Sequence, residues 1–206
     1  MGQTLSLSGL WPALVSLILA SAVVMGSPGP SPLSVTAIGA SFGFRRAFPY
    51  AAGLILGTGV VLLAVAAGLV SVLMAQPRLA PILLGLSAAY MAYLAYRIAT
   101  APPLSQAATE GRAPRFLGGF LLAIANPKAY LAIAAVFTGA RLATGSAIAD
   151  TLIKTAVLTV MIILIHLAWL AAGSVFARLL QNPGLSRIVN LAFAAILLVT
   201  TALALL

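Results

Sequence analysis

The first long apolar stretch of the chain, residues 11–32, reads WPALVSLILASAVVMGSPGPSP. It carries no charged residue, and its apolar residues run on without the alternation of a barrel strand, which is typical of a membrane-spanning helix. The Ser-Pro-Gly-Pro-Ser-Pro run at its end interrupts a helix, because proline lacks an N–H and restricts the residue before it. The stretch therefore predicts an apolar helix that is broken inside the membrane.

The composition of the whole chain supports a membrane protein. Of 206 residues, 63% are hydrophobic and 6% are charged, whereas a soluble domain carries roughly 25% charged residues. Eleven Lys or Arg against two acids give a net charge of +9. So few charges cannot both cover a water-facing surface and form a basic patch, so we expect no nucleic-acid partner. With no cysteine and one histidine, we expect no disulfide, no metal and no cofactor.

Apolar segments long enough to cross a bilayer recur along the chain. They lie at about residues 11–31, 50–74, 80–98, 116–140, 152–176 and 187–206. No Lys or Arg precedes the first segment, so we expect it to be a span and not a cleavable signal peptide. The fold class predicted is an all-α membrane protein with six transmembrane helices, embedded in a lipid bilayer.

The basic residues of alternate loops differ in number. One side holds seven: Arg45, Arg46, Arg97, Arg112, Arg115, Arg178 and Arg187. The other side holds three: Arg78, Arg141 and Lys154. Because Lys and Arg mark cytoplasmic loops, this count predicts that both termini are periplasmic.

A polar stretch at residues 99–114 divides the chain into two halves, residues 1–103 and 104–206. Three spans in each half predict inverted repeats, as in many transporters. The second half carries its own break, Asn126-Pro127-Lys128, about 100 residues after the first. Proline or glycine interruptions in matching segments indicate a transporter binding site. Two structural kinks are the alternative.

Both breaks are predicted to start new helices. Asn126 followed by Pro127 is the usual order for an N-cap and a first helical residue. In the first half we expect a start near Leu33, capped by Ser31 or Ser34. Helix starts present N–H donors and a positive dipole end, which favour an anion. The substrate-binding residues predicted at the breaks are Ser27, Pro28, Gly29, Pro30, Ser31, Asn126, Pro127 and Lys128.

Lys128 is the only charge within its span, 13 residues from both Arg115 and Arg141. A lysine near the bilayer midplane costs roughly 2.5–3.5 kcal/mol and marks a functional site by default. No carboxylate lies in any predicted span. The carboxylate of a bound substrate would supply the missing counter-charge; a lysine satisfied by carbonyls and water in a crevice is the alternative.

Further candidates lie in other spans. His166 is the single histidine, with a role either in substrate contact or proton transfer or in packing alone. Tyr90 shares a helix face with Tyr93 and Tyr96, so it either lines a cavity or belongs to a row of interface anchors. Gly53 and Gly57 form a GxxxG pattern that permits close helix packing.

Several of these segments together resemble the LysE/RhtB amino-acid exporters. They are Pro28-Gly29-Pro30, Gly43-Phe44-Arg45-Arg46-Ala47, Gly53 to Gly57, the stretch from Gly85 to Leu94, and Phe116 to Phe120 with Asn126-Pro127-Lys128-Ala129. The resemblance covers nearly the whole chain. It implies a six-helix carrier of the bacterial inner membrane, built of two inverted three-helix halves. It also implies efflux of amino acids or related small zwitterions coupled to the proton motive force.

The chain departs from the family at His166, because members often carry an acid there, a few positions before a tryptophan, here Trp169. A cavity with Lys128 and no acid would repel a second positive charge, so we expect neutral or acidic substrates. The mechanism expected is alternating access, with either His166 or Lys128 as the proton carrier. We expect a transporter and no enzyme; the alternative is a non-transporting membrane protein that acts as an assembly partner. A homodimer stays open.

Overall fold

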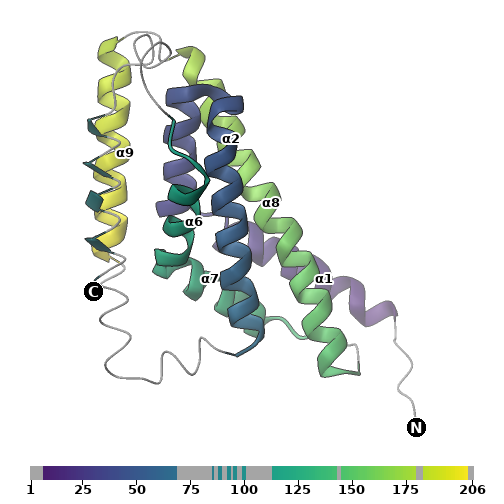
Figure 1. The fold of residues 1–206 in the computed structure, drawn as a ribbon. Coiled ribbons are helices and arrows are strands. Elements are labelled where there is room, and N and C mark those ends of the chain that lie inside the picture. Colours follow the sequence, from purple (N-terminus) through teal and green to yellow (C-terminus); the bar gives the residue numbers. More distant parts are fainter. Residues whose placement is uncertain are drawn as a thin grey trace.

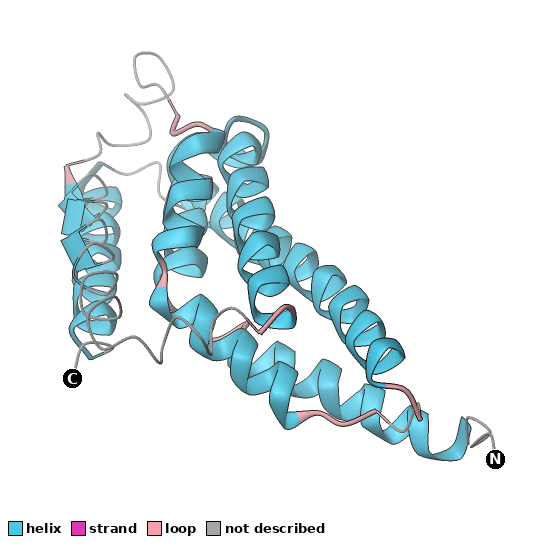
Figure 2. Ribbon diagram, turned by 60° about the horizontal axis from the view of Figure 1, so that its bottom comes forward, coloured by secondary structure: helices cyan, strands magenta, loops and turns pink. Residues whose placement is uncertain are grey.

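The structure is a computed structural model that describes residues 7–68, 113–142, 145–179 and 183–203, with residues 85, 88, 89, 92, 93, 95, 96, 99 and 100. Its helices are α1 (Leu7–Val24), α2 (Pro30–Ala66), α6 (Phe116–Ala125), α7 (Pro127–Gly139), α8 (Ala147–Leu179) and α9 (Pro183–Leu203). Figure 2 shows only helices and loops in this described part, which confirms the all-α class.

Within the described residues, two helical segments are long and apolar enough to cross a membrane, Pro30–Ala66 and Ala147–Val175. A third span results if α6 and α7, bent by 63° at Asn126, are counted as one. The break predicted in the fourth span is therefore confirmed. Most of the predicted span at 80–98 lies outside the described residues, and the total of six spans stays a prediction.

The helix α2 is a hairpin of two limbs, residues 30–42 and 44–66, which turn back on each other at Gly43 (Figure 1). Gly43 has φ 74° and ψ 167°, a backbone conformation almost restricted to glycine. The hydroxyl of Tyr50 on the second limb donates to Oγ of Ser34 on the first limb at 3.1 Å. The loop expected around Arg45 and Arg46 is thus wrong: one glycine makes the reversal, and both arginines are helical.

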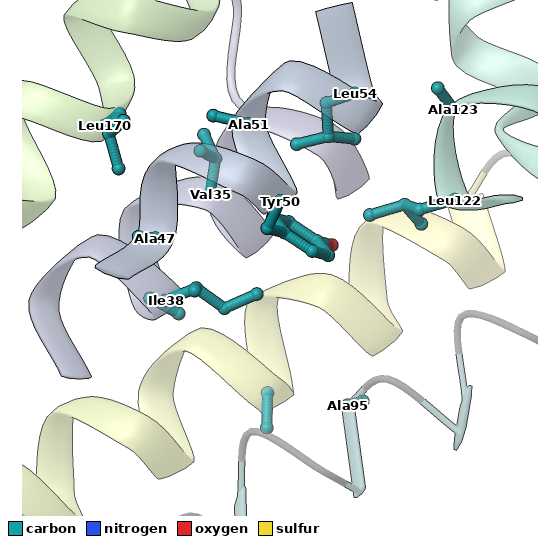
Figure 3. Packing of buried hydrophobic residues seen from close by; sticks show 12 residues of the cluster. Val35, Ile38, Ala47, Tyr50, Ala51, Leu54, Ala95, Leu122, Ala123 and Leu170 are labelled. Atoms are coloured by element: carbon teal, nitrogen blue, oxygen red, sulfur yellow. The ribbon is translucent and has the colours of Figure 1, made fainter. Parts of the chain in front are cut away.

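The hairpin builds one core with its neighbours. Tyr50 is 1% exposed and lies centrally in this core in Figure 3, between residues of the first limb and Leu122 of α6. Helices α8 and α9 contribute one buried residue each, Leu170 and Ala194. A second buried cluster joins α1 to the second limb, α7 and α8, through Leu17, Val61, Leu62, Val65, Ile133, Val136, Leu158 and Ile162. The first limb and the α6 side share one core, and α1 and α7 share the other.

Glycines set the closest helix approaches. A Cβ at Gly53 would meet the carbonyl oxygen of Phe116, and one at Gly57 would lie 2.8 Å from the carbonyl oxygen of Phe120. The second limb therefore touches the backbone of α6. On the first limb, a Cβ at Gly39 would lie 2.9 Å from the carbonyl oxygen of Leu170, and one at Gly173 of α8 would meet the backbone of Thr36. Each limb is thus fixed to a different helix.

Some helix starts differ from the sequence prediction. The helix α2 begins at Pro30 with Gly29 as an N-cap that makes no side-chain cap, so the expected serine cap and the start near Leu33 are wrong. Proline is well suited to a first helical position, and Ser34 instead donates to the carbonyl of Ser31 at 2.9 Å.

The helix α8 begins at Ala147, five residues before the predicted span at 152. Its first turns hold an ion pair of 2.7 Å between Asp150 and Lys154. Asp150 Oδ1 also accepts a hydrogen bond from the N–H of Leu142 at 2.8 Å. The prediction that Lys154 lies in a loop is therefore wrong, since it belongs to α8. Its side chain is 5% exposed, and its Nζ lies 5.3 Å from the ring centroid of Phe137. An acid four residues before a base on one helix face stabilises such a start.

Candidate functional site

The two breaks meet in space, and Lys128 joins them. Its ammonium group donates to the carbonyl oxygen of Ser27 at 2.7 Å, to Oγ of Ser27 at 2.8 Å and to the carbonyl oxygen of Pro28 at 2.7 Å. Lysine has three N–H donors, so the whole head group is occupied by a segment about 100 residues earlier in the chain. The lysine that sequence left without a partner is satisfied by the opposite break.

Asn126 makes a second link between the breaks. Its Oδ1 accepts from the backbone N–H of Lys128 at 3.1 Å, which confirms the predicted N-cap with Pro127 behind it. Its Nδ2 donates to Oγ of Ser31, at the start of α2, at 2.9 Å. Asn126 is 3% exposed. One buried side chain therefore caps its own helix and holds the other.

Gly29 makes room for the lysine. A Cβ at this position would lie 2.7 Å from Cδ and 2.8 Å from Nζ of Lys128. Its φ of −178° is ordinary extended backbone that any residue can adopt. Glycine is therefore needed at position 29 for the space it leaves, and not for its conformation.

The helix α8 also contacts break one and the first limb of α2, through Trp169. Trp169 Nε1 donates to the carbonyl oxygen of Gly26, within the first break, at 3.2 Å. The hydroxyl of Thr36, on the first limb, shares its single proton between the carbonyl oxygen of Pro32 on its own helix at 2.8 Å and that of Trp169 at 3.2 Å. Break one is therefore held from α7 by Lys128 and from α8 by Trp169.

A small cavity of about 40 Å³ lies between the breaks, with Ser31, Asn126, Lys128 and His166 on its wall. Nδ1 of His166 lies 2.8 Å from the carbonyl oxygen of Ile162, which assigns the ring proton to Nδ1 and leaves Nε2 as an acceptor. That Nε2 and the hydroxyl of Thr58 are buried, and neither has a hydrogen-bond partner among the described residues. Thr58 also lines the cavity.

Fewer backbone N–H groups are free at the two helix starts than the sequence predicts. Pro30 and Pro32 have no N–H, and the N–H of Leu33 already donates to the carbonyl oxygen of Gly29 at 2.9 Å. In α7 the N–H groups of Lys128 and Ala129 both donate to Asn126, at 3.1 and 3.0 Å. An anion entering here would therefore have to be bound mainly by the ammonium group of Lys128.

Most predicted site residues converge here: Ser27, Pro28, Gly29, Pro30, Ser31, Asn126, Pro127, Lys128 and His166 lie at the two breaks or at the cavity between α2, α7 and α8. Tyr90 lies outside the described residues. Gly53 and Gly57 lie away from the cavity, at the crossing with α6. Sequence reasoning missed Thr58 and the Trp169 link. The tryptophan three residues after the buried histidine was the one available signal.

Polar side chains gathered where two apolar helices break, on a helical chain with large apolar side chains such as Trp11 and Val23 about 70% exposed, indicate an integral membrane transporter. The chain belongs to the LysE type translocator family, whose match covers residues 22–206. Membership of a family of translocators confirms the expected class, a transporter and not an enzyme.

Two relatives show how far the likeness extends. An uncharacterized membrane protein of Pseudomonas aeruginosa is 33% identical over 138 residues, which is 62% of this chain and 62% of the relative. The cysteine/O-acetylserine efflux protein of Escherichia coli K12 is 27% identical over 171 residues, 83% of this chain and 86% of the relative. No solved structure matches the chain significantly.

Proposed function

We propose that this protein exports small neutral amino acids or related zwitterions across the bacterial inner membrane, driven by the proton motive force. The observation that carries the proposal is the link from Lys128 to Ser27 and Pro28, which brings the breaks of both halves together at one half-buried point. The name of the Escherichia coli relatives supports the substrate class, since cysteine and O-acetylserine are small and carry no net charge.

The architecture we propose is two inverted three-helix halves, residues 1–103 and 104–206, with both termini in the periplasm. The placement of the helix ends supports this. The bend of α2, the end of α8 and the start of α9 lie at one end of the molecule, and the start of α8 lies at the other (Figure 1). The predicted cytoplasmic cations Arg45, Arg46, Arg178 and Arg187 belong to that first set of ends.

The transport step we propose begins from a closed site. A cavity of about 40 Å³ is far below the roughly 300 Å³ of the smallest usual ligand pockets. For a substrate to enter, the ammonium of Lys128 leaves Ser27 and Pro28 and takes the substrate carboxylate instead. Re-forming the link as substrate leaves restores the closed arrangement, so alternating access becomes an exchange of acceptors at one lysine. The proton carrier we propose is either Lys128 or His166.

The test is export by a variant without the ammonium group. In everted membrane vesicles, Lys128→Met should lower substrate accumulation at least 100-fold, because a hydrogen-bonded charge is lost from the proposed site. Arg141→Met, at an exposed position in the loop after α7, is the matched control for removing one cation. Equal membrane content of all variants must be shown by fractionation. Normal accumulation by Lys128→Met would reject the site.

A single cysteine at Ala129 separates this proposal from a non-transporting membrane protein. The chain has no native cysteine, so labelling reports this position alone. An exporter exposes Ala129→Cys to water-soluble thiol reagents, and added substrate changes the labelling rate. A packing partner without an aqueous path leaves the cysteine unlabelled.

A further inference from the structure

Two of the residues that line the cavity between the breaks each carry a buried polar atom that no described residue satisfies. They are Nε2 of His166, on α8, and the hydroxyl of Thr58, on the second limb of α2. Both side chains are 5% exposed. Buried polar groups are nearly always hydrogen-bonded, so two of them on the wall of one cavity indicate a ligand that supplies their partners.

The chemistry of these atoms defines the ligand. Because Nδ1 of His166 donates to Ile162, its Nε2 accepts, and the threonine hydroxyl both accepts and donates. The ligand must therefore carry a hydrogen-bond donor. Much of the remaining wall is apolar and comes from Met25, Ile133, Ile162 and Ile165. A group with one polar hydrogen on a short apolar stem fits such a wall.

Charge and size narrow the choice further. Lys128 lies on the wall, and no acidic side chain among the described residues does, so a cationic donor such as an ammonium group is repelled. The volume of about 40 Å³ exceeds the roughly 10–15 Å³ that one water molecule needs but cannot take a whole amino acid. What fits is one small neutral group bearing an O–H or an S–H.

We propose that this cavity is the side-chain subsite of the exporter and takes a hydroxymethyl or thiomethyl group, as in serine or cysteine. The inference rests on the proposed function: the carboxylate binds Lys128, the side-chain O–H or S–H donates to His166 Nε2, and its oxygen or sulfur accepts from the hydroxyl of Thr58. Thr58 and His166 then distinguish a free hydroxyl or thiol from an apolar or O-acetylated side chain of similar or larger size.

The test compares serine with 2-aminobutyrate, whose ethyl group has nearly the shape of the serine side chain but no donor. In everted vesicles we expect wild type to prefer serine by about tenfold or more in kcat/KM, because a site built to hydrogen-bond a donor rejects the analogue without it. Thr58→Val keeps the shape and removes the hydroxyl, and it should lower this preference about tenfold. Thr58→Ser should retain the preference. O-acetylserine should be exported less well than serine.

A matched control is Thr159→Val on α8, since the hydroxyl of Thr159 is exposed and donates to the carbonyl oxygen of Thr155. It should leave the preference unchanged. Equal export of serine and 2-aminobutyrate by wild type, or an unchanged preference in Thr58→Val, means that the cavity holds water only and overturns the subsite. If the subsite is overturned but wild type exports amino acids and Lys128→Met does not, the proposed function still holds. Export of no amino acid by wild type overturns both.

Discussion

The break before α7 and the break before α2 differ in where their backbone groups find hydrogen bonds. Break two is a single residue, Asn126, whose side chain caps the helix that follows it. Break one runs from Met25 to Gly29 and has no side-chain cap of its own. Its carbonyls are bound instead by Lys128 and Trp169. We therefore expect break one to change its hydrogen bonds when α7 or α8 moves, because its carbonyls are bound by those helices. Break two keeps the cap that its own residue provides.

The packing on either side of each break differs in the same sense. The first limb, after break one, is fixed to α8 through Gly39 and Gly173. The helix α6, before break two, is fixed to the second limb through Gly53 and Gly57. The other half of each broken span, α1 or α7, belongs to the separate cluster around Leu17 and Ile133. Both helices contact the second limb and α8 in that cluster through side chains such as Val61 and Leu158, so we predict that they shift by side-chain repacking while the limbs and α6 stay in place.

After the loss of Lys128 itself, the largest effect is expected from filling the space that break one leaves for its side chain. Gly29→Ala places a methyl group 2.8 Å from Nζ, so the lysine has to move, and we expect it to lose hydrogen bonds to its carbonyls. Hydrogen bonds to a charged group contribute about 1.5–3 kcal/mol, so export should fall about tenfold or more. Vesicle transport measures this loss, with Gly59→Ala as the control, since no atom of the described part of the chain lies within 4 Å of a Cβ there. Equal export by the two variants would show that break one does not depend on the lysine.

A stability effect is expected where break two is anchored. Gly53→Ala puts a methyl group against the backbone of Phe116, and backbone cannot move aside as a flexible side chain can. Overpacking of this kind costs about 1–3 kcal/mol. The midpoint of thermal unfolding in detergent should fall for Gly53→Ala and stay near wild type for Gly59→Ala. Unchanged midpoints for both would mean that α6 is not fixed to the second limb.

The two roles of Asn126 can be separated by comparing two alanine variants. Asn126→Ala removes both the cap and the link to Ser31, and caps contribute about 1 kcal/mol. Ser31→Ala removes only the link, which leaves Nδ2 of Asn126 buried without its partner at a cost of about 1–3 kcal/mol. Unfolding midpoints should fall for both. Only Asn126→Ala should also increase proteolysis or hydrogen exchange at the start of α7. Equal protection of α7 in both variants contradicts self-capping.

The smallest effect is expected at Ser27. Its hydroxyl is one of three acceptors for Lys128, and the other two are backbone carbonyls that substitution does not remove. Ser27→Ala should therefore lower export by only about twofold, in line with one hydrogen bond among several. A loss as large as that of Gly29→Ala would mean that the hydroxyl, and not the backbone, binds the ammonium group.

Local chemistry explains what the sequence could predict at this site. Asn126 and Pro127 predicted the start of α7 correctly, because capping depends on residues that are neighbours in the chain. The place of Lys128 in the middle of an apolar segment was also evident, since it lies 13 residues from both Arg115 and Arg141. Its acceptors were not, since they are carbonyls about 100 residues away, and every residue has a carbonyl.

The other differences also have physical reasons. Gly43 stands beside Arg45 and Arg46, so the segment suggested a loop, although a single glycine suffices to reverse a helix. Thr58 lies in a long apolar span, where a hydroxyl normally bonds to a carbonyl of its own helix, so its presence does not indicate a binding site. Only the packing of α2 against α7 and α8 showed that this hydroxyl reaches a cavity.

The bend at Gly43 also has a consequence for the order of assembly. The contact of Tyr50 with Ser34 closes across 16 residues, so both limbs can pair as soon as that short segment has left the ribosome. The bond from Lys128 to Ser27 spans 101 residues and must wait for the second half of the chain. Contacts between neighbours in sequence form faster than distant ones, so the hairpin is expected to be the scaffold on which the later helices dock. A truncated chain ending before α6 should already be protease-resistant at the hairpin, with break one still open to cleavage.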